Sequence, residues 1–223
     1  MKFIPHTLGI ATLIMALPVQ ADSGLDQAIL GIQHQWEHIN YEVPDTEKPD
    51  AFVKLEQQED VLVRKYSHQP EPLIWYGITL SSHAGAKGGL GALSLAKQAR
   101  NQLMAAERIN PDAMQGSIYT SLGTLYYKVP GWPIGFGDDS KAESYLKKAV
   151  QVNPNGIDSN YFYGDFLYGK HRYQAAMQYL DRALVARPRP ERPLADKGRR
   201  QEIEVLMAKI ESETGDSIRS SSR

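Results

Sequence analysis

The chain has 223 residues, of which 42% are hydrophobic and 23% charged, and its formal net charge is −1. These values are those of an ordinary globular protein with one domain or two small ones. So balanced a charge argues against nucleic-acid binding, which depends on basic side chains that neutralise phosphates. Because the chain has no cysteine, it has neither a disulfide framework nor a cysteine for a lipid anchor.

Residues 1–21 predict a cleaved secretory signal. Lys2 precedes an apolar run from Leu8 to Leu17, and the segment ends in VQA, with small residues where a signal peptidase cuts. The run is about ten residues long and therefore too short to span a bilayer. Removal of the single lysine in this segment leaves a net charge of −2. We expect a soluble periplasmic protein that is not a lipoprotein.

A first pair of helices is predicted over residues 25–41 and 48–66, before Pro70. Within it, the letters HQWEH at 34–38 fit H-x-x-E-H, the inverted zincin motif, in which Glu37 would be the catalytic base.

The same letters have a simpler interpretation, as a helix with Trp36 and Ile39 turned inward and His34 and His38 partly exposed. The motif is short, and no third zinc ligand can be assigned. We therefore predict that the protein is not an enzyme and holds no metal and no cofactor.

The clearest repeat begins at Gly164. Small or bulky residues follow it at intervals of 3, 12, 16, 19 and 24, namely Leu167, Ala176, Leu180, Ala183 and Pro188. This spacing predicts a helical hairpin with small residues where the two helices cross and a proline that ends the second helix.

Two further copies lie upstream, each with an insertion between its helices. Gly123 to Ala142 is 19 residues and Gly77 to Ala99 is 22, against 12 in the clean copy. We expect the additional seven and ten residues to form long loops at 128–138 and 81–92. The other matching positions are Tyr119, Leu122, Tyr126, Leu146, Ala149 and Pro154 in one copy and Tyr76, Leu80, Leu103, Ala106 and Pro111 in the other.

The pattern resembles the tetratricopeptide (TPR) repeat. It predicts an all-α fold, a TPR-like α-solenoid of about four stacked hairpins within residues 22–212. Residues 194–212 have Ile203, Leu206, Met207 and Ile210 on one face and predict a C-terminal capping helix. Residues 213–223 are polar and predict a disordered tail.

Four phrases point to a narrower resemblance: AGAKGGLGAL, SLGTLYYKVPGWPIGFGDD, NPNGIDSNYFYGDFL and RPLADKGRR. Over about residues 70–205 the chain resembles a family of exported bacterial TPR proteins with no established activity. It is more distantly similar to the periplasmic TPR component found beside TRAP transporters, which is thought to engage a substrate-binding partner.

The narrower resemblance assigns no function. From the TPR-like architecture and the two insertions we expect a non-catalytic protein-interaction module that binds through its concave face and through the two loops. The predicted partner-binding residues are Trp132, Phe136, Tyr127, Tyr161, Asp165, Tyr168 and Lys87. Two interpretations of the apolar loop stay open, since Trp132, Ile134 and Phe136 could pack on the solenoid or contact a partner. The alternative function is a small-ligand or transporter-accessory protein whose loops close over a solute.

Basic residues give no clear sign of a binding site. The glycine-rich segment 81–92 lacks the P-loop pattern, so no nucleotide site is predicted. TPR proteins that hold a peptide's C-terminal carboxylate use cations at groove positions of the first helices, and this chain has none there. The arginines between residues 187 and 200 are interpreted as solvated side chains of a Pro-rich linker.

Overall fold

The computed structural model describes residues 23–221, and the predicted signal at 1–21 lies outside them. The described chain is built of helices, which confirms the all-α prediction. None of these helices is both long and apolar enough to cross a membrane. The elements are α1 (Ser23–Tyr41), α2 (Lys48–Lys65), α3 (Pro70–Lys87), α4 (Gly89–Ile109), the 3-10 turn η1 (Ala113–Gly116), α5 (Ser117–Lys128), α6 (Asp139–Val152), α7 (Ile157–Gly169), α8 (Tyr173–Leu184) and α9 (Pro193–Ser221).

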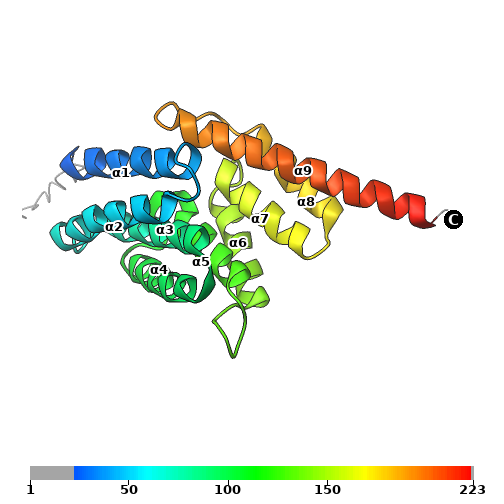
Figure 1. Cartoon of the computed structure of the whole chain (residues 1–223). Coiled ribbons are helices and arrows are strands. Elements are labelled where there is room, and N and C mark those ends of the chain that lie inside the picture. The colour runs from blue at the N-terminus through cyan, green and yellow to red at the C-terminus, as the bar shows by residue number, and fades with distance from the viewer. Residues whose placement is uncertain (1–22, 222–223) are drawn as a thin grey trace, which may run out of the picture.

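Successive helices pair as hairpins, α1 with α2, α3 with α4, α5 with α6 and α7 with α8 (Figure 1). The prolines predicted to end the second helices stand just past α4, α6 and α8, at Pro111, Pro154 and Pro188. Three apolar clusters of buried residues lie along the stack. The first is formed by α1 to α3, the second mainly by α3 to α5, and the third by α5 to α9. Partly buried residues pack against two clusters at once, Phe136 and Tyr145 at one junction and Ile78 and Met114 at the other, so neighbouring hairpins share core contacts, as a solenoid requires.

Close crossing of the two helices depends on glycine in the three hairpins from α3 to α8, as predicted. A Cβ atom on Gly123 would lie 2.6 Å from Leu146 Cγ, and Gly77 and Gly164 stand in the same relation to leucines of α4 and α8. A side chain at these positions would push the helices apart.

We expect Gly123→Ala to lower the free energy of unfolding by about 1–2 kcal/mol, because overpacking outweighs the gain in helix propensity. Gly31→Ala is the matched control, since a Cβ there meets nothing within 4 Å. This control should stabilise the protein by about 1 kcal/mol. Urea denaturation of both variants gives the comparison, and equal stabilisation by the two would contradict the predicted close crossing.

One of the two predicted loops is present, and the prediction of the other is wrong. Residues 129–138 connect α5 to α6 without helical structure, whereas only Gly88 separates α3 from α4. Alanine, serine and leucine in the insertion lengthen both helices, so the additional residues extend the hairpin rather than form a loop. Gly88 has φ +62°, which lets the chain reverse direction within a single residue.

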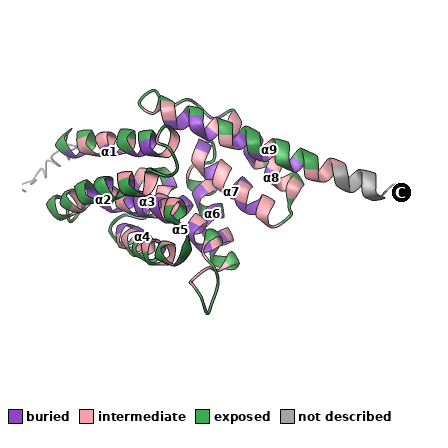
Figure 2. Ribbon diagram, viewed as in Figure 1, coloured by how far each residue is buried: buried purple, intermediate pink, exposed green. Residues whose placement is uncertain are grey.

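Helix α9 closes the stack. It begins beside α1 and runs across α7 and α8, and Ile203, Leu206 and Ile210 are buried in their shared core (Figures 1 and 2). This confirms the predicted cap. The helix extends to Ser221, well past residue 212, so residues 213–221 of the predicted tail are helical.

Candidate functional site

The concave side of the solenoid holds a cavity of about 600 Å³. Its wall is formed by α1, by the first helices α3, α5 and α7, by the first half of α4, by η1 and the loop at 129–138, and by α9 with the segment that leads into it. The apolar members of the wall include Trp36, Trp75, Ile78, Leu93, Ala96, Leu125, Val129, Ile134 and Phe162. Six serine and threonine residues add polar groups, namely Ser81, Ser82, Ser117, Thr120, Ser121 and Thr124.

Several of these hydroxyls bond within their own helix. Thr120 Oγ1 donates to the carbonyl of Gly116 at 3.2 Å and Thr124 Oγ1 to that of Thr120 at 2.8 Å. Ser82 Oγ accepts from the indole N–H of Trp36 at 2.9 Å, which fixes that ring in the wall. Most of the cavity surface is therefore apolar with internally satisfied hydroxyls, a composition common in ligand pockets.

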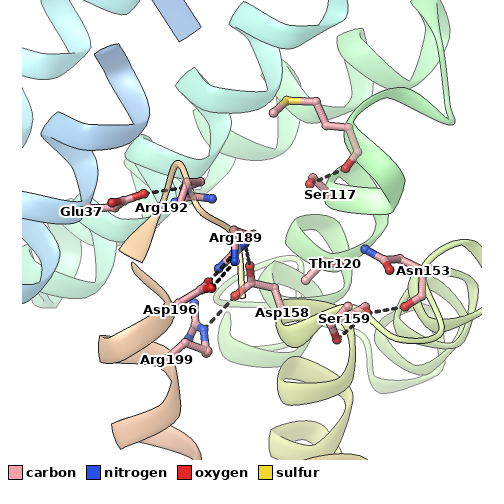
Figure 3. Close-up of polar contacts among 12 residues, drawn as sticks. Glu37, Ser117, Thr120, Asn153, Asp158, Ser159, Arg189, Arg192, Asp196 and Arg199 are labelled. Atoms are coloured by element: carbon pink, nitrogen blue, oxygen red, sulfur yellow. Dashed lines mark hydrogen bonds and ion pairs between the residues drawn. The ribbon is translucent and has the colours of Figure 1, made fainter. Parts of the chain in front are cut away.

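Charged side chains meet at one region of the wall (Figure 3). Asp158 of α7 accepts from Arg199 Nε through one oxygen and from Arg189 Nη1 through the other, both at 2.8 Å. Arg189 Nε also donates to Asp196 at 2.7 Å. This network joins α7 to the linker and to α9.

Burial and neighbouring charges shift the pKa of the Asp158 carboxyl in opposite directions. Burial alone would raise the pKa of its carboxyl, but the guanidinium groups of Arg199, Arg189 and Arg192 outweigh burial and hold that pKa well below its usual range. Asp158 is therefore ionised at neutral pH and keeps two arginines in place.

A second ion pair ties the two ends of the solenoid together. Arg192 Nε donates to Glu37 Oε1 at 2.5 Å, and the Glu37 side chain is only 2% exposed (Figure 3). Nearby, the His34 ring bonds to the carbonyl of Glu191 at 2.7 Å. The linker before α9 is thus fastened to α1 on the side where it borders the cavity.

These contacts also bear on the HQWEH motif. Glu37, which would be its base, is paired with Arg192, and His38 bonds to Glu42 at 2.7 Å. Within residues 23–221 there is no group of three or more His, Cys, Asp or Glu side chains that could hold a metal ion.

The loop at 129–138 is partly packed and partly exposed. Phe136 packs edge-on against Tyr126 with centroids 5.7 Å apart, and the Arg100 guanidinium lies 4.2 Å from the Phe136 centroid. Gly137 N–H donates to the Pro130 carbonyl at 2.9 Å, which closes the loop at its base. Both open interpretations therefore describe part of the loop, since Phe136 packs whereas Trp132 is 89% and Ile134 68% exposed.

The predicted binding residues mostly have partners within the fold, and none of the seven belongs to the cavity wall. Three of them pack against other side chains: Tyr127 on Phe166, Phe136 on Tyr126, and Tyr161 under the Arg199 guanidinium. Two have polar partners, since Asp165 pairs with Lys128 and Tyr168 donates to Glu213. The other two are exposed, Lys87 at the end of α3 and Trp132 at the loop tip. Their role in binding stays a prediction.

On α7 the residues that reach the cavity are Asp158 and Phe162, one turn apart, while Tyr161, Asp165 and Tyr168 contact other elements. The arginine network was missed by sequence reasoning. Its acids come from α1, α7 and α9, and no local pattern connects residues so far apart in the chain. The only available signal was the density of arginines at 187–200.

Similarity to the solved structure of a TPR protein supports this architecture. TTC0263, a thermophilic TPR protein of Thermus thermophilus, matches 81% of this chain and 99% of its own, with a TM-score of 0.53 and 15% identity. PilF of Pseudomonas aeruginosa is 13% identical over 85% of this chain and 91% of its own, with a TM-score of 0.36. Neither a protein-family model nor a curated protein sequence matches.

The hairpin stack and the similarity to TTC0263 define the class of fold as that of TPR proteins, a helical-repeat solenoid. Solenoids of this kind present extended concave surfaces suited to binding. The narrower similarity to the TRAP-transporter component stays a prediction.

Proposed function

We propose that this protein is a non-catalytic recognition module of the periplasm that binds a partner protein through its concave cavity and the adjoining loop at 129–138. The observation that carries the proposal is a largely apolar cavity whose wall includes Ile134, two residues from the exposed Trp132. Exposed apolar side chains beside a concave apolar surface are typical of protein-interaction sites. Segment 81–92, which was expected to form a loop that contacts the partner, instead contributes residues such as Gly85, Gly89 and Ala92 to the cavity wall.

The two exposed loop residues give a direct test. We expect the double variant Trp132→Ser, Ile134→Ser to lose at least tenfold in affinity for the partner, because aromatic anchors contribute much of the affinity of protein interfaces. The partner is first captured from a periplasmic extract with the wild-type protein and identified, and its affinity is then measured by calorimetry.

Val205→Ser is the matched control, since Val205 is 70% exposed but lies on α9 away from the cavity wall. This control should bind like the wild type. Equal binding by the double variant would remove the loop from the proposed interface and leave the cavity alone.

A second candidate is binding of a small solute. It is favoured by the arginine-bearing linker, which covers part of the concave face, and by a volume within the range of about 300–1,000 Å³ found for small-molecule sites. A solute that binds the folded protein raises its melting temperature. A thermal-shift screen of candidate solutes therefore distinguishes this function from partner binding alone.

A further inference from the structure

The serine and threonine hydroxyls of the cavity wall are mostly used within the fold. Five of them donate to backbone carbonyls three or four residues earlier in the chain, at 2.7 to 3.2 Å, namely Ser81, Ser82, Ser117, Thr120 and Thr124. Among the described residues Ser121 is the exception. The indole N–H of Trp75 and the hydroxyl of Tyr41 are also unpaired there, but both atoms are buried and out of reach of an occupant. The wall therefore offers an occupant few free hydrogen-bond donors.

Among the described residues, each cation of the wall is paired with at least one acid. Figure 3 shows Asp158 bonded to Arg189 and Arg199, and Glu37 bonded to Arg192. The full set is Arg189 with Asp158 and Asp196, Arg199 with Asp158 and Glu202, Arg192 with Glu37, and Lys128 with Asp165. Four cations thus face five carboxylates, so the wall has no excess charge that would attract an ion. A charged occupant would lose its hydration there without gaining a counter-charge.

Apolar side chains line the cavity on several sides. They come from α3, α4, α5, α7 and the loop at 129–138, and include Ile78, Leu93, Leu125, Phe162 and Ile134. Between them stand small residues of α3 and α4, which leave the space open, namely Ala84, Gly85, Gly89, Ala92 and Ala96. The resulting cavity of about 600 Å³ has room for a molecule of ordinary ligand size.

An extended peptide fits this wall poorly. It carries an N–H and a C=O at each residue, and such groups are costly to bury where the wall offers them no partners. The linker before α9 also covers part of the concave face, and it is held to α1 by the pairs Arg192 with Glu37 and Glu191 with His34. A long chain lying along the face would have to displace this linker. A compact apolar molecule meets neither obstacle.

We propose that the cavity binds an uncharged, mostly hydrocarbon small molecule, which packs against Ile78, Leu93, Leu125 and Phe162. The site rests on the proposed function, in its solute-binding form, and the class of solute is what the wall adds to it. Burial of apolar surface supplies the affinity. Since Ser121 has the one serine or threonine hydroxyl of the described wall that is not already bonded, the molecule carries at most one polar group that needs a donor there.

The test compares two fluorescent probes that share one aromatic framework and differ in charge. N-phenylnaphthylamine is neutral, and anilinonaphthalene sulfonate carries a sulfonate on the same rings. Fluorescence titration of the whole protein gives the dissociation constant of each probe. We expect the neutral probe to bind about tenfold more tightly or better, because the paired cations leave the sulfonate without a partner.

Partial filling of the cavity tests where the neutral probe binds. Gly85 belongs to the wall, and a Cβ atom there would meet nothing within 4 Å, so Gly85→Leu adds a side chain in open space. This variant should weaken binding of the neutral probe about tenfold or more, and Gly85→Ala should weaken it less. Gly31→Leu is the matched control, because Gly31 also lies in a helix with open space around it but outside the wall. It should bind the probe as the wild type does, and neither leucine variant should melt at a lower temperature, since leucine favours helix more than glycine.

Equal or tighter binding of the sulfonate probe, or unchanged binding of the neutral probe by a folded Gly85→Leu variant, overturns the proposal. A leucine-rich hexapeptide that binds wild type but not Gly85→Leu, with no binding of the neutral probe, would assign the cavity to a peptide instead. The proposed function can fail separately. If the Trp132, Ile134 variant loses a captured protein while the neutral probe does not bind, the interaction module stands and the apolar solute site falls. If the probe binds at the Gly85 wall and no protein is captured, the site stands and its function is solute binding.

Discussion

Arg192→Ala is expected to destabilise the protein by about 3–5 kcal/mol. The substitution leaves the Glu37 carboxylate buried without its cation, and removal of one partner of a buried pair has an effect of this size. It also removes the guanidinium from the Trp75 ring. The melting temperature should fall by roughly 2–4 °C for each kcal/mol, which differential scanning calorimetry measures directly.

Two controls separate the buried charge from other effects. Arg64→Ala breaks an exposed ion pair on α2, with Asp60, and should change stability by less than about 1 kcal/mol. The double variant Glu37→Gln, Arg192→Ala removes both charges and should recover more than half of the loss, because a neutral amide is far less costly to bury. If Arg192→Ala is no more destabilising than Arg64→Ala, the pair does not fasten α1 to the linker.

Stability is expected to fall as the pH rises from about 5 to about 8.5, to an extent set largely by one buried acid, Glu59. The carboxyl is buried between α2 and α3, where Thr79 Oγ1 donates to Oε1 at 2.7 Å while Oε2 has no partner among the described residues. Burial, opposed by the Thr79 hydrogen bond, raises the pKa of Glu59 from 4.5 to about 8.

The direction follows from proton binding. Between pH 4.5 and 8 the folded protein keeps the Glu59 proton that the unfolded chain releases, so stability declines as pH rises and levels off above the folded pKa. The full effect is about 3–5 kcal/mol, at about 1.36 kcal/mol for each unit of pKa difference. The carboxyl of Asp158 has a lowered pKa and loses its contribution only in more acidic solution, outside this range.

Glu59→Gln should flatten this dependence. The amide oxygen can still accept from Thr79, and the side chain has no proton to release. Urea denaturation at about pH 5, 7 and 8.5 should therefore show the variant gaining on the wild type as pH rises. Asp60→Asn, at a partly exposed neighbour, is the control and should follow the wild type. Parallel curves for Glu59→Gln and wild type would show that Glu59 is ionised in the folded protein.

The repeat and most of the helices could be predicted from the order of residues alone. Glycine, alanine and proline at fixed intervals report contacts between helices close in the chain, such as Gly123 against Leu146, and such contacts leave a periodic trace. The apolar periodicity of Ile203, Leu206 and Ile210 placed the capping helix for the same reason. Composition failed at 81–92, where glycines suggested a loop but the surrounding helix formers extended both helices across it.

The charge pairs beside the cavity could be identified only once the chain was folded. Arg192 meets Glu37 across 155 positions and Arg199 meets Asp158 across 41, so no local spacing records either pair. Arg189, Arg192 and Arg199 looked solvated because their partners on α7 and α1 are supplied only when the end of the solenoid folds back on earlier helices, whereas Arg187 is exposed as expected. Long-range charge pairing depends on how the hairpins stack, and that stacking is a property of the folded core, which a run of arginines in the sequence does not encode.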